Sequence, residues 1–134
     1  MQTVKPITTL TNLLTKNNFE VKEVQKNKYI VAFKKGYPRL YFEVLRKGVS
    51  VKNTKQLNDS VLMNANNVLE FINELNKQTI MSKYYLQSES VISIEAMIFQ
   101  PMNEQDFGYI LNILKHDMKQ ILLSNRNSRK YLAT

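Results

Sequence analysis

With 134 residues, 43% of them apolar and 10% aromatic, the chain is long enough for one domain with a hydrophobic core and too short for two ordinary domains. It has no cysteine, which excludes disulfides, thiolate metal sites and cysteine nucleophiles. Its apolar runs extend over only a few residues, whereas a membrane-spanning helix needs about 20, and its first residues lack the apolar run of a signal peptide. We therefore expect a cytoplasmic protein that does not enter a membrane.

The net charge of +8 is unevenly distributed along the chain. Residues 1–60 carry 12 Lys and Arg against 4 Asp and Glu, whereas residues 61–124 carry 4 against 7. A basic segment of this kind can form a surface for nucleic acid or another anionic partner. A compositional bias is the alternative, because 15 lysines outnumber 4 arginines, whereas nucleic-acid surfaces favour the arginine fork. Both interpretations remain open.

The first half of the chain predicts a short helix followed by an antiparallel meander. Apolar residues between positions 7 and 17 share one side of a helix that follows Pro6. The next stretches are rich in β-branched and aromatic residues, and they predict strands at 19–25, 28–35, 39–46 and 48–53. Short turn sequences separate them, so consecutive strands are expected to pair as hairpins. The last strand is the most polar and is expected at a sheet edge.

A helix is predicted over residues 64–77, where asparagines accompany a clear apolar stripe. The stripe consists of Ala65, Val68, Leu69, Ile72 and Leu75. Asn76 lies near the exit of the helix, where asparagine tolerates the left-handed conformation that ends helices. Asn73 lies within the helix, where asparagine is unfavourable without a partner, so we expect it to bond to the hairpin that follows.

The remaining pattern predicts a hairpin and a long final helix. Strands are expected over SKYYLQ and SVISIEAMIF, and a helix with an apolar stripe over residues 103–122. Tight hairpins and one-sided helices predict an α+β fold in which helices flank an antiparallel sheet, in the order α-βββ(β)-α-ββ-α. We expect one domain over residues 1–124 and a flexible basic tail over residues 125–134.

No set of residues indicates catalysis, a cofactor or a metal site. His116 is the only histidine and lies off the apolar stripe of the final helix, whereas a zinc site needs three or four convergent ligands. Glu70 and Glu74 stand one helical turn apart, but Lys77 follows at a spacing typical of a solvated charged face. The three glycines are isolated and form no phosphate-binding loop. We therefore expect a non-enzymatic protein without a cofactor.

Two surfaces are candidates for binding. If Leu40, Phe42 and Val44 face the helices, alternation places another set of apolar residues on the opposite face of the sheet. This set, a candidate for partner binding, consists of Tyr41, Leu45, Tyr85, Met97 and Phe99. Basic residues among the strands and turns form a candidate for nucleic-acid contact. They are Lys22, Lys34, Lys35, Arg39, Arg46 and Lys47.

Residues 67–99 resemble the YbjN family of candidate bacterial sensory transduction regulators. The family's helix phrase FLNELN is matched by FINELN at residues 71–76, with Ile72 in place of the usual leucine. Further matches in the hairpin are Tyr84, Tyr85, Val91, Ile94 and Glu95, and residues 103–122 resemble the closing helix of the family in length and placement. The resemblance implies the fold shared with type III secretion chaperones, which are commonly dimeric and bind proteins.

These observations lead to one functional hypothesis and two alternatives. The leading hypothesis is a chaperone-like or regulatory module that binds a partner polypeptide through a sheet face or as a homodimer. The first alternative is a nucleic-acid-binding regulator that uses the basic strands. The second is a small immunity or antitoxin-like protein.

Overall fold

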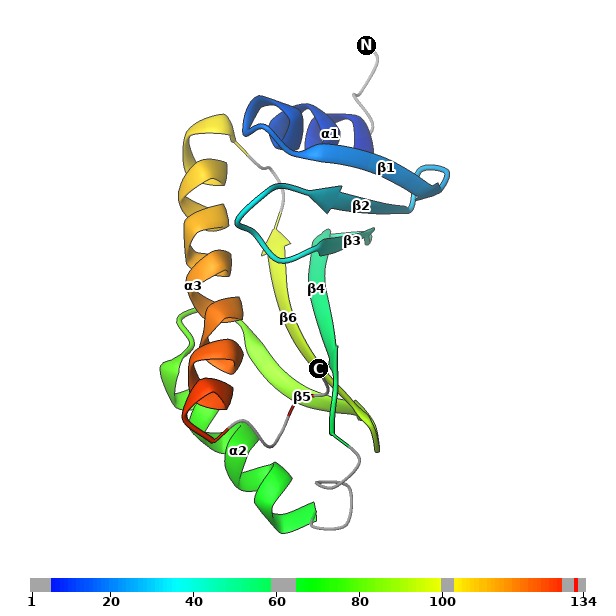
Figure 1. The fold of residues 1–134 in the computed structure, drawn as a ribbon. Coiled ribbons are helices and arrows are strands. Elements are labelled where there is room, and N and C mark those ends of the chain that lie inside the picture. The colour runs from blue at the N-terminus through cyan, green and yellow to red at the C-terminus, as the bar shows by residue number, and fades with distance from the viewer. Residues whose placement is uncertain (1–5, 59–64, 100–102, 129–131, 133–134) are drawn as a thin grey trace. The chain divides into compact units, whose positions relative to one another are not determined.

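The computed structural model describes residues 6–58, 65–99, 103–128 and 132, with helices and strands in the order expected from the sequence (Figure 1). The elements are α1 (Pro6–Lys16), β1 (Glu20–Gln25), β2 (Tyr29–Phe33), β3 (Leu40–Val44), β4 (Gly48–Gln56), α2 (Ala65–Gln78), β5 (Lys83–Ser88), β6 (Val91–Phe99) and α3 (Glu104–Ser128).

The chain divides into two compact units. The first unit comprises residues 1–52 and 96–112, and the second comprises residues 53–95 and 113–134. Three elements, β4, β6 and α3, begin in one unit and end in the other. Each unit buries apolar side chains of its own helices and strands.

The strands form one sheet in the order β1-β2-β3-β4-β6-β5, and the predicted antiparallel α+β fold is confirmed. The expectation that residues 48–53 form an edge strand is wrong, because β4 lies between β3 and β6. Its polar residues suggested an edge, but Ser50 and Asn53 are buried within the strand. The edges are β1 and β5, and each carries a register irregularity, a feature that discourages pairing with another sheet.

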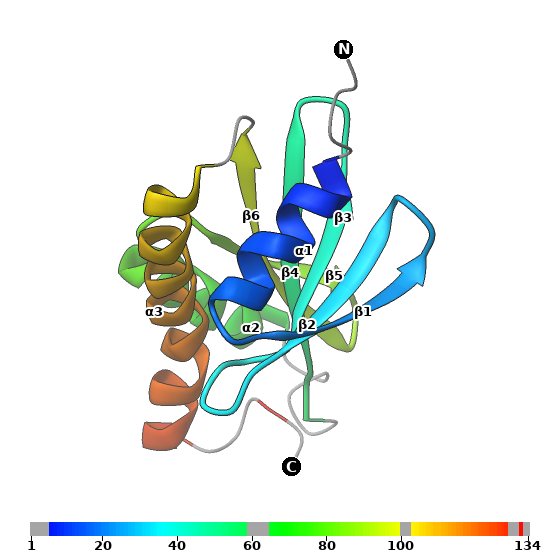
Figure 2. The same cartoon turned by 90° about the horizontal axis from the view of Figure 1, so that it is seen from above.

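In the first unit, α1 lies across the inner face of the strands (Figure 2). Leu10 and Leu14 of α1 are fully buried, as is Val49 of β4, and Phe42 of β3 is nearly so. α1 ends at Lys16, and Asn18 shortly after it has a φ of 67°, the left-handed conformation that terminates helices and that asparagine tolerates. Burial of this apolar face stabilises α1, which at 11 residues is too short to be stable alone.

In the second unit, α2 buries a face slightly different from the predicted stripe. Val68, Ile72 and Leu75 are buried as expected, whereas the side chain of Ala65 lies outside the described residues. The inclusion of Leu69 is wrong, because its side chain is 51% exposed. Phe71 is buried instead, so the buried face of α2 is rotated from the side of Leu69 to the side of Phe71.

One buried carboxylate organises the turn between α2 and β5 in the second unit. Asp117 of α3 is fully buried, and its side chain accepts hydrogen bonds from three consecutive backbone N–H groups. The donors are Ile80 at 2.7 Å, Met81 at 3.0 Å and Ser82 at 2.9 Å. Hydrogen bonds to an ionised group are roughly twice as strong as neutral ones. Asp117 therefore fixes the turn to α3.

The final helix continues beyond its predicted end. α3 extends to Ser128, so the beginning of the segment expected as a tail is helical. Leu132 forms an antiparallel bridge with Leu57 and is buried in the second unit. Residues 129–131 and 133–134 lie outside the described residues.

Candidate functional site on the sheet of the first unit

Strand register separates the two faces of the sheet in the first unit. Phe42 stands opposite Ile30 and Val51, and all three are buried on the inner face. Tyr41 stands opposite Val31 and Lys52 in the neighbouring register position. Because successive residues of a strand point to opposite faces, Tyr41 lies on the outer face.

Four exposed apolar residues of the first unit lie on or next to this outer face. Tyr41 is 40% exposed, Leu45 36%, Met97 38% and Phe99 68%. Met97 and Phe99 alternate along β6 with the buried residues Ala96 and Ile98, so they point away from the core. These four residues are named the outer apolar cluster.

Backbone contacts bring two residues of the outer apolar cluster, Leu45 and Phe99, close together. The N–H of Leu45 donates to the carbonyl of Gly48 at 2.8 Å. A Cβ added at Gly48 would clash with the carbonyl oxygen of Ile98 and lie 3.1 Å from the Cα of Phe99. Gly48 therefore lets β4 approach β6 closely, and this approach places Phe99 beside the turn that carries Leu45.

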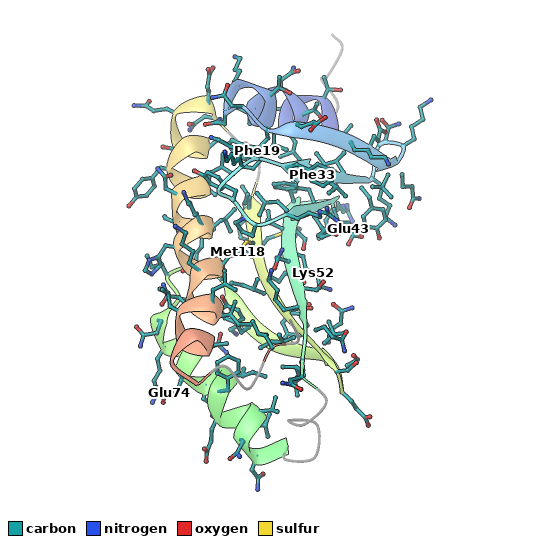
Figure 3. The ribbon with its side chains drawn as sticks, viewed as in Figure 1. Phe19, Phe33, Glu43, Lys52, Glu74 and Met118 are labelled. Atoms are coloured by element: carbon teal, nitrogen blue, oxygen red, sulfur yellow. The ribbon has the colours of Figure 1, made fainter. Side chains whose placement is uncertain are left out.

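Small and polar residues complete the outer face around the cluster. Ser50 pairs with Glu43 and is only 8% exposed, so larger neighbours cover it. Glu43 projects from β3 and Lys52 from β4 (Figure 3). The hydroxyl of Tyr29 donates to Oε2 of Glu43 at 3.0 Å, and this hydrogen bond is the main reason why the pKa of Tyr29 is raised. An apolar centre with charged and polar neighbours is the composition found at protein interfaces.

The fifth candidate for partner binding, Tyr85, belongs to the second unit. It is half-buried on β5, and its hydroxyl donates to Oε2 of Glu95 at 2.9 Å. Its pairing with Ser93 places both residues on the same face of that hairpin.

The six basic candidates occupy three separate places in the first unit. Lys34, Lys35 and Arg39 lie in or next to the loop between β2 and β3 and line one pocket. Arg46 and Lys47 are exposed in the turn between β3 and β4, at the opposite end of β3. Lys22 pairs with Val31 across β1 and β2 and therefore lies on the outer face. The structure thus gathers only three of the six.

The partners that hold the basic loop in place were not predictable from the sequence. The ammonium of Lys34 donates to the carbonyl of Asn17 at 2.9 Å and lies over the rings of Phe19 and Tyr37. The guanidinium of Arg39 lies 4.7 Å from the ring centroid of Phe33. An asparagine pair before a strand is a signal for a helix end, but nothing in the sequence links that end to a loop 17 residues away.

The described residues contain no group of three or more His, Asp and Glu side chains placed to hold a metal ion. Within the same part of the chain, no helix is long and apolar enough to cross a membrane.

Comparisons with known proteins show the fold. No protein-family model matches the chain, and neither does any curated protein sequence. Among solved structures, the chain is similar to the crystal structure of YbjN from E. coli, a candidate transcription regulator. The two share 11% sequence identity with a TM-score of 0.75, and the alignment covers 98% of this chain and 100% of the other. The chain therefore has a YbjN-like fold, as the resemblance of residues 67–99 implied.

Proposed function

We propose that this chain, with its YbjN-like fold, is a non-enzymatic regulatory module that binds a partner polypeptide through the outer apolar cluster of its first unit. The observation that carries the proposal is the exposure of Tyr41, Leu45, Met97 and Phe99 around a strand with small residues, Gly48 and Ser50. Large apolar side chains exposed together commonly mark an interaction site.

The chemistry of this face favours a polypeptide with apolar side chains. Tyrosine, methionine and phenylalanine are enriched in the buried centres of protein interfaces, and methionine adapts its shape to different partners. The inner faces of β3 and β6 are anchored in the core, so Tyr41, Met97 and Phe99 are held on strands, and Leu45 lies in the tight turn that follows β3. Binding then buries the cluster without ordering new backbone, which lowers its entropic cost. Tyr85 is outside this proposal because it belongs to the second unit.

The test is capture of a partner from native lysate by the wild-type chain and two matched variants. Tyr41→Asp with Phe99→Asp places two charges in the cluster and is expected to abolish capture. Leu69→Asp with Ile80→Asp changes two exposed apolar residues of the second unit and is expected to retain it. Circular dichroism confirms that both variants are folded.

A photo-crosslinking residue in place of Phe99 identifies the occupant of the cluster. A crosslink to a captured polypeptide supports the proposal, whereas a crosslink only to a second copy of the chain shows a homodimer interface instead. Undiminished capture by the folded Tyr41→Asp, Phe99→Asp variant would rule out this surface.

A nucleic-acid partner is the second candidate, because Lys22 and Lys52 lie on the same outer face and the fold is shared with a candidate transcription regulator. Such binding weakens steeply with salt, since each neutralised phosphate releases counterions. An electrophoretic mobility shift at about 50 mM salt that disappears by about 200 mM is expected. The absence of a shifted DNA or RNA band at the lower salt would eliminate this candidate.

A further inference from the structure

The loop between β2 and β3 forms one wall of a pocket that the proposed polypeptide surface does not use. The pocket has a volume of about 460 Å³. It is lined by Asn18, Glu20, Phe33, Lys34, Lys35, Tyr37 and Arg39, all in the first unit. Three cationic side chains and one carboxylate give the lining a net positive charge.

Local backbone structure fixes the shape of this loop. The N–H of Tyr37 donates to the carbonyl of Lys34 at 3.0 Å, which closes a four-residue turn. Gly36 occupies the third position of the turn with a φ of 87°, as a type II turn requires. On the facing side, the left-handed Asn18 ends α1 and leaves the Asn17 carbonyl directed at Lys34. The pocket is therefore preformed rather than assembled on binding.

The Lys34 ammonium of the pocket is positioned by neutral groups. The ammonium of Lys34 lies 5.4 Å from the ring centroid of Phe19 and 4.9 Å from that of Tyr37. Its hydrogen bond to the Asn17 carbonyl uses one of its three donors. Within the described residues, neither Lys34 nor Lys35 forms an ion pair with a carboxylate. Rings and a carbonyl orient a cation without cancelling its charge, so the positive potential remains available to a ligand.

We infer that this pocket is a binding site for a phosphate group. The tetrahedral oxyanion of the phosphate accepts hydrogen bonds from the Lys34 and Lys35 ammonium groups and from the guanidinium of Arg39, whose planar fork suits phosphate oxygens. The ring faces of Phe33, Phe19 and Tyr37 already carry cations, so they orient these donors rather than stack a base. The phosphate comes from a free nucleotide or polyphosphate, or from a nucleic-acid backbone. The site is independent of the outer apolar cluster and does not rest on the proposed polypeptide partner.

The experiment is a titration of the ¹⁵N-labelled chain with sodium pyrophosphate and, separately, with a short oligothymidylate, at constant ionic strength. Amide signals of Asn18, Glu20, Lys35 and Gly36 are expected to shift saturably. The test variant is Lys35→Gln with Arg39→Gln, and the control is Arg46→Gln with Lys47→Gln, which removes the same charge at the other end of β3. All four side chains are exposed, and the fold of each variant is checked by its spectrum.

The pocket variant is expected to lose roughly tenfold or more in affinity for pyrophosphate, and the control about twofold or less. Affinity for pyrophosphate that equals or exceeds the affinity for oligothymidylate indicates a free phosphate compound, whereas tighter oligothymidylate binding with the same pattern across variants indicates a nucleic-acid backbone. The absence of saturable shifts would overturn the inference, because the pocket would then bind no phosphate. An equal loss in both variants would overturn it too, because binding would then depend only on overall charge. Capture of a polypeptide by the outer cluster does not bear on either outcome.

Discussion

Asn76 and Tyr84 are joined by two reciprocal hydrogen bonds between the last turn of α2 and the first residues of β5. The side-chain amide of Asn76 donates to the Tyr84 carbonyl at 3.0 Å, and the Tyr84 N–H donates to Oδ1 of Asn76 at 2.7 Å. The Asn76 side chain thereby pairs with both backbone groups of Tyr84, as a residue of a neighbouring strand would. Asn76 connects the helix to the hairpin, a role that the sequence suggested for Asn73.

Replacement of Asn76 by alanine is expected to reduce the free energy of unfolding by about 2 kcal/mol. The substitution removes both hydrogen bonds and leaves the N–H and carbonyl of Tyr84 without their side-chain partner. The matched control is Asn73→Ala in the same helix, where the side chain is exposed and alanine is the better helix former. Urea unfolding measures both. A loss in Asn73→Ala as large as that in Asn76→Ala would contradict the assignment.

Replacement of Asp117 by asparagine is expected to cost about 2–4 kcal/mol of stability, because three N–H groups of one turn converge on its buried carboxylate. An amide retains one acceptor oxygen but directs an NH₂ group at the remaining donors. Glu74→Gln makes the same charge change at an exposed carboxylate paired with Lys77 and is expected to change stability by less than about 1 kcal/mol. Denaturant midpoints of the two variants provide the comparison, and similar midpoints would refute the role given to Asp117.

Tyr84 is expected to make stability fall at alkaline pH. Burial raises the pKa of its phenol, and the nearby charge of Asp117 adds to this effect, while the N–H of Ile121 opposes it. Because the folded-state pKa is raised, the contribution of the neutral phenol is complete below the unfolded pKa of about 10 and is lost as the pH rises above that value.

The measurement for Tyr84 is urea unfolding at about pH 8 and about pH 10.5. The wild type is expected to lose roughly 1 kcal/mol more than Tyr84→Phe over this interval. At the lower pH, Tyr84→Phe is expected to be less stable by about 1–2 kcal/mol, because its hydroxyl donates to the Asp117 carbonyl and accepts from the Ile121 N–H. Tyr109→Phe, at an exposed tyrosine, serves as the control. An identical pH dependence in wild type and Tyr84→Phe would exclude this role.

Two Gly→Ala substitutions are expected to change the stability of the fold in opposite directions. Gly48→Ala introduces a Cβ that clashes with the Ile98 carbonyl, so β4 and β6 must separate, at an expected cost of about 2 kcal/mol or more. Gly108→Ala lies within α3, where the nearest atom to the new Cβ is Oδ1 of Asn17 at an ordinary 3.6 Å. It is expected to stabilise by up to about 1 kcal/mol through helix propensity. Thermal unfolding of both variants checks the signs, and a neutral Gly48→Ala would show that the strands can move apart freely.

Elements with a single dominant pattern were predicted correctly from the sequence. The apolar periodicity of α1, α2 and α3 and the β-branched strands of the first meander reflect one requirement, namely that one face of each element is buried. The predictions were wrong where the pattern of apolar and polar residues did not by itself decide which face or strand is buried. Leu69 and Phe71 stand on either side of the α2 stripe, and only the packing of the helix decides which is buried. The polar β4 was assigned to an edge because the burial of Ser50 and Asn53 depends on neighbouring strands.

Only those features of the candidate site that depend on neighbouring residues of one strand were predictable from the sequence. Alternation along β3 and β6 correctly indicated that Tyr41, Met97 and Phe99 point away from the buried side chains, since this follows from the two-residue period of a strand. The separation of the six basic candidates into three places was not predictable, because it depends on the paths that the turns between the strands take. The pocket depends on Asn17 and Phe19 meeting Lys34, a contact between an α1 terminus and a later loop.

The sequence by itself determined the α+β class, the order of the elements and the alternation that exposes the outer apolar cluster, because these depend on interactions between residues close in the chain. Only the tertiary structure decided that β4 is central, that Asn76 rather than Asn73 holds the hairpin, that Asp117 binds the 80–82 turn and that three of the basic residues share a pocket. Each of these joins segments distant in sequence. Their proximity is set by which faces pack together, and hydrophobic burial is non-directional, so composition and periodicity leave the specific partners undetermined.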